Sequence, residues 1–363
     1  MRIPSIFHLQ EPHRPNRIVL LDFLRGCGML LVLIHHSNLP NPYGHWIIAF
    51  HMPLLFLLSG YTTYLRARTS RFTVFLRGRF LRLILPYFLF EGVNLLVWSV
   101  SLFLQGGWQD VTDAVTAILA CVNTEGYSGY YGRLWFWPCM FVSDLYFYWI
   151  LQFAPKNHHR RQCYLAAAIL IMLGISWITC RLLPFRLPFT ADTACMATAF
   201  ILTGYLFGSQ ISWLLQKSRL FTDIVLLTCA LLAMGLAIMT ETTSLLMYIN
   251  EYGHYGYTLC AAYSGILVFL IIAKWLYRLC ASAGFLKSLI LWYGYHSLGT
   301  FPVHLSIKIW ICQSLPPVCR SWYILLPAML LLNIPIVNLI EKYFPFMLGN
   351  RWSFPHKAKA SQP

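Results

Sequence analysis

Ten stretches of mainly apolar residues follow one another along the chain, and each has about the length of ~20 residues that a helix needs to cross a bilayer. We therefore expect an all-α integral membrane protein with about ten transmembrane helices. Composition agrees, because 58% of the residues are hydrophobic and only 11% are charged, too few for the polar surface of a soluble domain. The expected spans are residues 18–37, 46–65, 83–104, 134–153, 163–180, 192–215, 224–240, 252–273, 288–311 and 321–340.

Lysine and arginine are shared unequally between the segments that join these spans. Cytoplasmic segments of membrane proteins carry an excess of both residues. One alternating set of segments, which includes both chain ends, has 21 of them, and the other set has 4. We therefore expect both termini in the cytoplasm and basic segments that contact the anionic inner leaflet of the plasma membrane. The net charge of +15 does not indicate a nucleic-acid partner, because the cations lie in short tracts between apolar runs.

The expected organisation is a cytoplasmic N-terminal segment (1–17), a single membrane domain of ten helices (18–342) and a basic cytoplasmic tail (343–363). The first apolar run contains Asp22 and Arg25 and is followed by no small-residue cleavage site. It is therefore expected to be a retained helix and not a signal peptide. The 11 cysteines have no CxxC pair or regular spacing, so we interpret them as packing residues, neither disulfides nor ligands of a metal.

Ionisable residues inside a membrane are costly, and each marks a candidate functional site. Asp22 and Arg25 are three residues apart in the first span, so they can form an ion pair on one helical face. Arg25 and His36 also share a face, separated by about 16 Å along the axis, whereas His35 points about 100° away from it. By the expected topology, His36, His51 and His304 come from three different spans and lie at similar depth in the outer half of the membrane.

Several motifs occur in an order typical of a known family. Arg25 and His36 form an Arg-x10-His pattern, and residues 50–61 read FHMPLLFLLSGY. Further matches are RLILPY at 82–87, LWF at 134–136, the stretch 192–205, and GYHS at 294–297 followed by His304. The chain resembles the membrane acyltransferase 3 family, and within it the branch of fucose 4-O-acetylase and related sugar O-acetyltransferases. His296 stands where that family usually has asparagine.

The resemblance implies transfer of an acyl group, most simply acetyl, from cytoplasmic acyl-CoA to a hydroxyl of a sugar in an extracellular or envelope glycan. Acyl-CoA would be a co-substrate, with no tightly bound cofactor. His36 would act as general base, because imidazole accepts protons near neutral pH. Arg25 would bind the donor. Among the supporting residues, Arg79 and Arg82 would hold the phosphates of coenzyme A, and His51 and His304 would orient His36 or bind the acceptor. The residues that could contact the sugar are Trp135, Asp192, Glu91 and Asp144, for each of which packing is the competing explanation.

Other classes of protein remain open at this point. A polytopic transporter or flippase could use buried Arg, Asp and His residues as a substrate or proton pathway. It would predict internal pseudo-symmetry, which the sequence lacks. An acyltransferase with another acceptor, such as peptidoglycan, a lipid-linked glycan or an antibiotic, fits the same motifs. A catalytically inactive sensor is disfavoured by the intact Arg25 and His36 pair.

Overall fold

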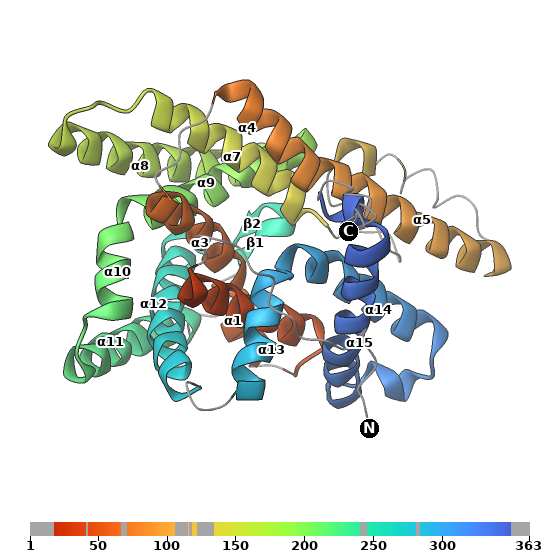
Figure 1. Cartoon of the computed structure of the whole chain (residues 1–363). Helices are drawn as coiled ribbons and strands as arrows, with labels where there is room; N and C mark the ends of the chain where they lie inside the picture. The colour runs from red at the N-terminus through yellow and green to blue at the C-terminus, as the bar shows by residue number, and fades with distance from the viewer. Residues whose placement is uncertain are drawn as a thin grey trace, which may run out of the picture.

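A computed structural model describes residues 18–40, 43–66, 71–105, 115, 118–121, 134–239, 245–280 and 284–349. Within these ranges the protein is helical, apart from one two-stranded hairpin (Figure 1). The helices are α1 (Val19–His36), α2 (Tyr43–Ile48), α3 (His51–Arg66), α4 (Phe72–Arg79), α5 (Leu85–Gln105), α7 (Phe136–Gln152), α8 (His158–Leu182), α9 (Ala191–Leu206), α10 (Gly208–Gln216), α11 (Leu220–Met239), α12 (Tyr255–Leu279), α13 (Gly284–Tyr295), α14 (Ser297–Ser314) and α15 (Trp322–Tyr343).

Short elements connect these helices. A π-helical turn, η2 (Phe80–Ile84), joins α4 to α5. Strands β1 (Leu245–Leu246) and β2 (Glu251–Tyr252) pair antiparallel, with Leu245 opposite Tyr252. The 3-10 turns are η3 (Pro188–Thr190), η4 (Met247–Ile249), η5 (Pro317–Arg320) and η6 (Pro345–Leu348).

The all-α membrane architecture expected from the sequence is confirmed. Every expected span contains a helix or a pair of helices. By length and composition, six helical segments of the described chain can cross a membrane, or seven if the bent pair α9 and α10 is one span. The six are Val19–His36, Trp46–Arg66, His158–Leu182, Leu220–Met239, Tyr255–Leu279 and Trp322–Tyr343.

The other three expected spans, 83–104, 134–153 and 288–311, do not meet that test. Helix α7 has 17 residues, one fewer than the length required. Helix α14 contains Pro302, His304 and Lys308, which make it more polar than an ordinary lipid-facing helix. The number ten and the orientation of the termini therefore stay predictions.

Two of the expected spans are broken helices. Residues 192–215 form α9 and α10, which meet at Phe207 with a bend of 62°. Residues 288–311 form α13 and α14, which meet at His296 (φ −95°, ψ 17°). The mean hydropathy of a span does not reveal such breaks, because it does not report which backbone hydrogen bonds are interrupted.

Helix α1 packs against α13, and α3 packs against α9, through close backbone contacts (Figure 1). A Cβ atom at Gly294 would collide with the carbonyl oxygen of Asp22, and one at Gly204 would collide with the carbonyl oxygen of Leu57. Small residues allow membrane helices to approach to such distances. The Gly294 contact fixes α13 beside the segment of α1 that carries Asp22 and Arg25.

A buried ion pair ties α11 to α12. Lys274 Nζ lies 2.5 Å from Asp223 Oδ2, and each side chain is 1% exposed. Trp275 Nε1 donates to the same oxygen at 2.9 Å, and Ser218 Oγ donates to Asp223 Oδ1. Because these groups satisfy one another, we interpret the pair as structural.

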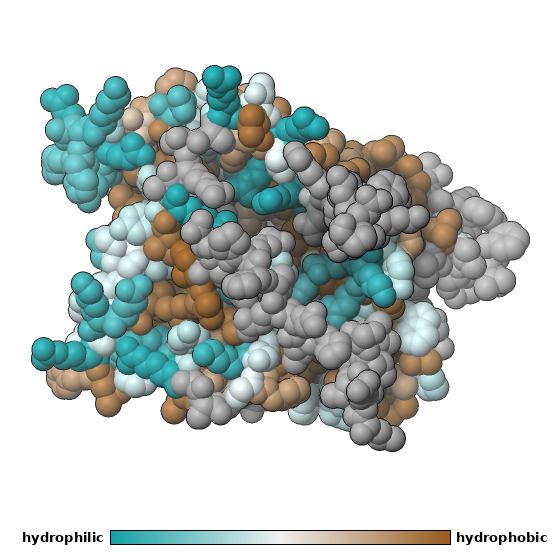
Figure 2. All heavy atoms as spheres, viewed as in Figure 1, coloured by the Kyte–Doolittle hydropathy of each residue, from teal (hydrophilic) through white to brown (hydrophobic). Residues whose placement is uncertain are grey.

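Hydrophilic residues gather on one face over the turn between α7 and α8 and over the turn between α10 and α11 (Figure 2). The basic residues of the two segments are Lys156, Arg160, Arg161, Lys217 and Arg219. Both turns belong to the set that the charge count assigns to the cytoplasm.

Candidate functional site

Four histidines from three helices form a continuous row, which we call the histidine chain. It runs from His51 on α3 through His35 and His36 on α1 to His304 on α14. The ring centroids are 4.8 Å apart for His51 and His35, 5.2 Å for His35 and His36, and 5.1 Å for His36 and His304. The structure thus brings together His36, His51 and His304, the three histidines singled out from the sequence. His35 lies between His51 and His36.

His35 is the residue that sequence reasoning missed. Its direction, about 100° from the face of His36, excluded it from the expected site. In the structure, α3 lies on that side of α1, so His35 points toward His51. The adjacent His35-His36 pair and the histidine at the start of the next span were the available signals, but only the packing of α1 on α3 connects them.

Backbone hydrogen bonds orient the two ends of the histidine chain. His51 Nδ1 donates to the carbonyl oxygen of Ile47 at 2.9 Å, and His304 Nδ1 donates to that of Thr300 at 3.1 Å. Each Nε2 is then an acceptor when the ring is neutral. His51 is 3% exposed and His304 is fully buried. Among the described residues, His304 Nε2 and His35 Nδ1 have no hydrogen-bond partner. The histidine chain therefore retains nitrogen atoms that can accept a proton or bind a hydroxyl.

A cation lies beside the histidine chain. Lys308 is one turn beyond His304 on α14, and its charge acts on His35, His36 and His304. Its Nζ donates to Asn38 Oδ1 at 2.9 Å, just beyond the end of α1. Lys308 was visible in the sequence as an ionisable residue within a span, but nothing there connected it to the histidines.

Arg25 lies between α1 and α3, away from the end of this helix pair that carries His35, His36 and His51. It forms the expected ion pair with Asp22, with NH1 3.6 Å from Oδ1, and its NH2 donates to Thr62 Oγ1 on α3 at 2.8 Å. Helices α1 and α3 are antiparallel neighbours, and 11 residues separate Arg25 from His36 as well as His51 from Thr62. Each interval corresponds to about 16 Å along a helix.

Further arginines gather around Arg25, and we call Arg25, Arg66 and Arg79 the arginine cluster. The charges of Arg66 and Arg79 act on Arg25. Arg79 Nε lies 3.2 Å from Asp144 Oδ2 on α7, an ion contact without the alignment of a hydrogen bond. The side chains of Arg25 and Arg79 are 29% and 33% exposed, so part of each is accessible at the protein surface.

Arg82 was expected to act with Arg79. It is exposed and lies in η2, the π-helical turn that begins directly after Arg79. Gly349, with φ +67°, packs against the backbone of Leu81 and Arg82, so the chain after α15 returns to this turn. Single π-helical turns inside helices are frequent at functional sites.

The other predicted site residues have structural partners. Glu91 Oε1 accepts a hydrogen bond from Leu134 N at 3.1 Å, just before α7. Trp135 is buried and packs edge-on against Phe136. His296 Nδ1 lies 2.9 Å from Glu341 Oε1 on α15, at the break between α13 and α14.

Asp192 is engaged by Arg186. Arg186 Nε and NH2 approach the two carboxylate oxygens of Asp192 at 2.5 and 3.3 Å. The same guanidinium donates to the carbonyl oxygen of Tyr248 at 2.7 Å and to Thr193 Oγ1 at 3.0 Å. With the carboxylate 1% exposed, Asp192 joins the start of α9 to η4, apart from the histidine chain.

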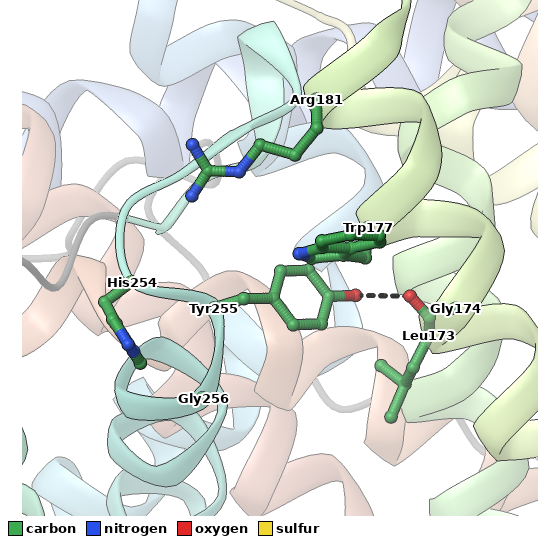
Figure 3. A pocket seen from close by; sticks show the side chains of 7 residues that line it. All are labelled: Leu173, Gly174, Trp177, Arg181, His254, Tyr255 and Gly256. Carbon is green, nitrogen blue, oxygen red and sulfur yellow. Dashed lines mark hydrogen bonds between the residues drawn. The ribbon is translucent and has the colours of Figure 1, made fainter.

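Two of the hollows in the described part of the chain bear on the position of the site. One, of about 530 Å³, lies between α8 and α12 and is lined by Trp177, Arg181, His254 and Tyr255 (Figure 3). It contains none of the predicted site residues. The other, of about 610 Å³, is apolar and includes Ile47, whose carbonyl oxygen holds His51. No group of three or more His, Cys, Asp or Glu side chains in the described residues has an arrangement suited to a metal ion.

Comparison with known proteins identifies the protein family. Residues 18–354 match the acyltransferase domain model of the acyltransferase 3 family, which is nearly the whole chain, so the protein belongs to this family of membrane acyltransferases. A curated relative, the nodulation protein NolL of Mesorhizobium japonicum, is 26% identical over 209 residues, which are 54% of this chain and 50% of NolL. The chain thus matches about half the length of that relative. No solved structure matches it.

Proposed function

We propose that this membrane acyltransferase moves an acetyl group from acetyl-CoA to a hydroxyl of a sugar, with His36 as general base. The observation that carries the proposal is the separation of two clusters on α1 and α3. A histidine chain suited to proton transfer lies at one end, and an arginine cluster suited to phosphate lies at the other. A large anionic thioester and a neutral alcohol need these two different environments.

In the proposed reaction, His36 accepts the proton of the acceptor hydroxyl. The alcohol oxygen attacks the thioester carbonyl carbon, the C–S bond breaks, and the coenzyme thiolate takes the proton back from His36. Products are the sugar ester and free coenzyme A. A positioned imidazole contributes about 10²- to 10⁴-fold to such a step. His35 and His304 contact the two sides of the base and limit its rotation.

Arg25 acts on the donor in this proposal. Asp22 and Thr62 hold its guanidinium in place, and the remaining N–H groups can bind a phosphate of the donor. Arg79 adds a second partly exposed guanidinium. The donor would enter from the cytoplasm, and its acetyl arm would extend along α1 toward His36 at the outer side of the plasma membrane.

A sugar acceptor is supported by the motifs of the sugar O-acetyltransferase branch. An alcohol on a glycan outside the cell is consistent with the proposed position of the histidine chain.

The test uses membranes that contain wild-type protein or His36→Ala, supplied with labelled acetyl-CoA and a panel of glycan acceptors. We expect the wild type to label a glycan and His36→Ala to label it at least about 100-fold more slowly. His159→Ala, an exposed histidine at the start of α8, is the control and should retain activity. Transfer by His36→Ala at the wild-type rate would exclude His36 as the base. Absence of transfer by the wild type, with movement of a solute instead, would favour a transporter.

A further inference from the structure

Five aromatic rings form a second extended feature, which we call the aromatic ladder. Phe72 and Phe75 come from α4, Tyr148 and Trp149 from α7, and Phe153 follows α7. Phe75 and Tyr148 stack with centroids 4.7 Å apart, and Phe72 lies 5.1 Å from Trp149. Trp149 and Phe153 are 6.0 Å apart and nearly parallel, with 22° between their planes. Phe72 connects the two stacked pairs at a tilt, with 49° to Tyr148 and 42° to Trp149, so the five rings are in continuous contact.

One end of the aromatic ladder meets the arginine cluster. Arg79 Cζ lies 5.4 Å from the centroid of the Phe75 ring, a cation–π contact, while its Nε pairs with Asp144. Helix α4 also presents Arg77 to solvent, and Arg71 precedes its first residue. Positive charge and aromatic faces thus occur side by side, at the end of α3 opposite to His51.

The other end of the aromatic ladder is open. Trp149 is 43% exposed and Phe153 is 71% exposed. Aromatic residues at a membrane interface commonly anchor a protein in the headgroup region. The ring-to-ring contacts toward Arg79 go beyond that role, because they connect the exposed rings to a cation that is itself next to the proposed donor site.

We propose that the aromatic ladder binds the adenine ring of the coenzyme A donor, with Trp149 and Phe153 as the stacking surface and the arginines of α4 as partners of the phosphates. This inference rests on the proposed function, since it assigns the nucleotide half of the same donor. Adenine stacks well on indole and phenyl faces, and arginine binds phosphate through paired N–H groups. The pantetheine arm then extends from Arg79 toward Arg25 and the histidine chain.

The experiment compares two donors, acetyl-CoA and S-acetylpantetheine, which has the same thioester arm without the nucleotide. Loss of base stacking weakens binding by about 5- to 150-fold. We expect Trp149→Ala to raise KM for acetyl-CoA by a factor in that range and to leave kcat/KM for S-acetylpantetheine unchanged. Trp149→Phe keeps a ring face and should recover most of the affinity.

The control is Trp177→Ala on α8, which removes an equally exposed tryptophan (49%) from the hollow in Figure 3. This variant should leave the kinetic constants for both donors unchanged. An equal loss with both donors in Trp149→Ala would mean that Trp149 only supports the fold, and unchanged use of acetyl-CoA would remove it from the donor site. Either result overturns the proposal.

A binding measurement separates this inference from the proposed function. Isothermal titration of the full-length protein in nanodiscs with adenosine 3′,5′-bisphosphate requires no transfer. We expect binding by the wild type that Trp149→Ala weakens and Trp149→Phe retains, even if no acceptor is ever acetylated. Failure of the wild type to bind this nucleotide would overturn the aromatic ladder as a nucleotide site, whatever the enzyme transfers.

Discussion

The two ends of the α1 and α3 pair differ in chemistry. At the histidine end, His51 and His304 are almost fully buried and are held by backbone carbonyl groups, and His35 and His36 between them are partly buried. At the arginine end, Arg25 and Arg79 are about a third exposed and pair with carboxylates. A base that must receive a proton from one hydroxyl benefits from neighbouring rings that fix its position, whereas a site for a large anion needs guanidinium groups that remain accessible. The difference supports separate sites for the acceptor and the donor.

His36→Ala should give the largest effect. Removal of the proposed base should lower kcat by about 100-fold or more and leave donor affinity unchanged, because the arginine end is intact. Rates with saturating donor and titration with coenzyme A would measure the two quantities separately. A large drop in coenzyme A affinity would show that the two ends are not independent.

Arg25→Lys tests the arginine end of the α1 and α3 pair. Lysine keeps the charge but loses the planar fork that reaches Asp22 and Thr62. Loss of a charge-assisted hydrogen bond costs about 1.5–3 kcal/mol, so KM for acetyl-CoA should rise by about 10- to 100-fold. KM for the acceptor should change little, and steady-state kinetics with each substrate varied in turn would show it. An equal rise in both constants would contradict the assignment of Arg25 to the donor.

Contacts within one helix could be predicted from the sequence, whereas contacts between helices could not. Spacing within one helix was sufficient for the ion pair of Asp22 and Arg25, because residues three apart lie on one helical face. The shared face of Arg25 and His36 stays a prediction. Spacing was insufficient for His35, whose neighbour is decided by the packing of α3. The breaks at Phe207 and His296 were missed because the mean hydropathy of a span does not report which backbone hydrogen bonds are interrupted.

Asp192 illustrates the opposite case. A buried carboxylate at the start of a helix looks functional in the sequence, but its partner Arg186 lies in an irregular segment whose path the sequence does not define. The contact between Arg79 and Asp144 could not be predicted either, because it joins two helices that are distant in sequence.

His304→Ala should have a moderate effect confined to the histidine end. The variant removes a ring that packs against His36 and leaves the base itself in place. We expect kcat to fall by about tenfold, less than the about 100-fold loss expected for the base itself, with unchanged KM for acetyl-CoA. His304→Gln, which can still donate and accept hydrogen bonds, should be closer to wild type. A loss equal to that of His36→Ala would give His304 the role of base.

Asp192→Asn should have the smallest effect on the reaction and a clear effect on stability. Removing one partner of a buried ion pair costs about 3–5 kcal/mol, because the charge of Arg186 is left uncompensated. We expect a lower melting temperature in detergent and a KM for the acceptor within about twofold of wild type, since Asp192 is not in contact with the histidine chain. A selective rise in acceptor KM at unchanged stability would return Asp192 to the acceptor site.

Transfer across a sealed membrane tests most directly whether donor and acceptor meet from opposite sides. Proteoliposomes would be loaded with labelled acetyl-CoA, washed, and given a membrane-impermeant glycan acceptor on the outside only. The account predicts labelled glycan outside while acetyl-CoA stays inside, and no label with His36→Ala. Label that appears only when both substrates are placed on the same side would contradict it.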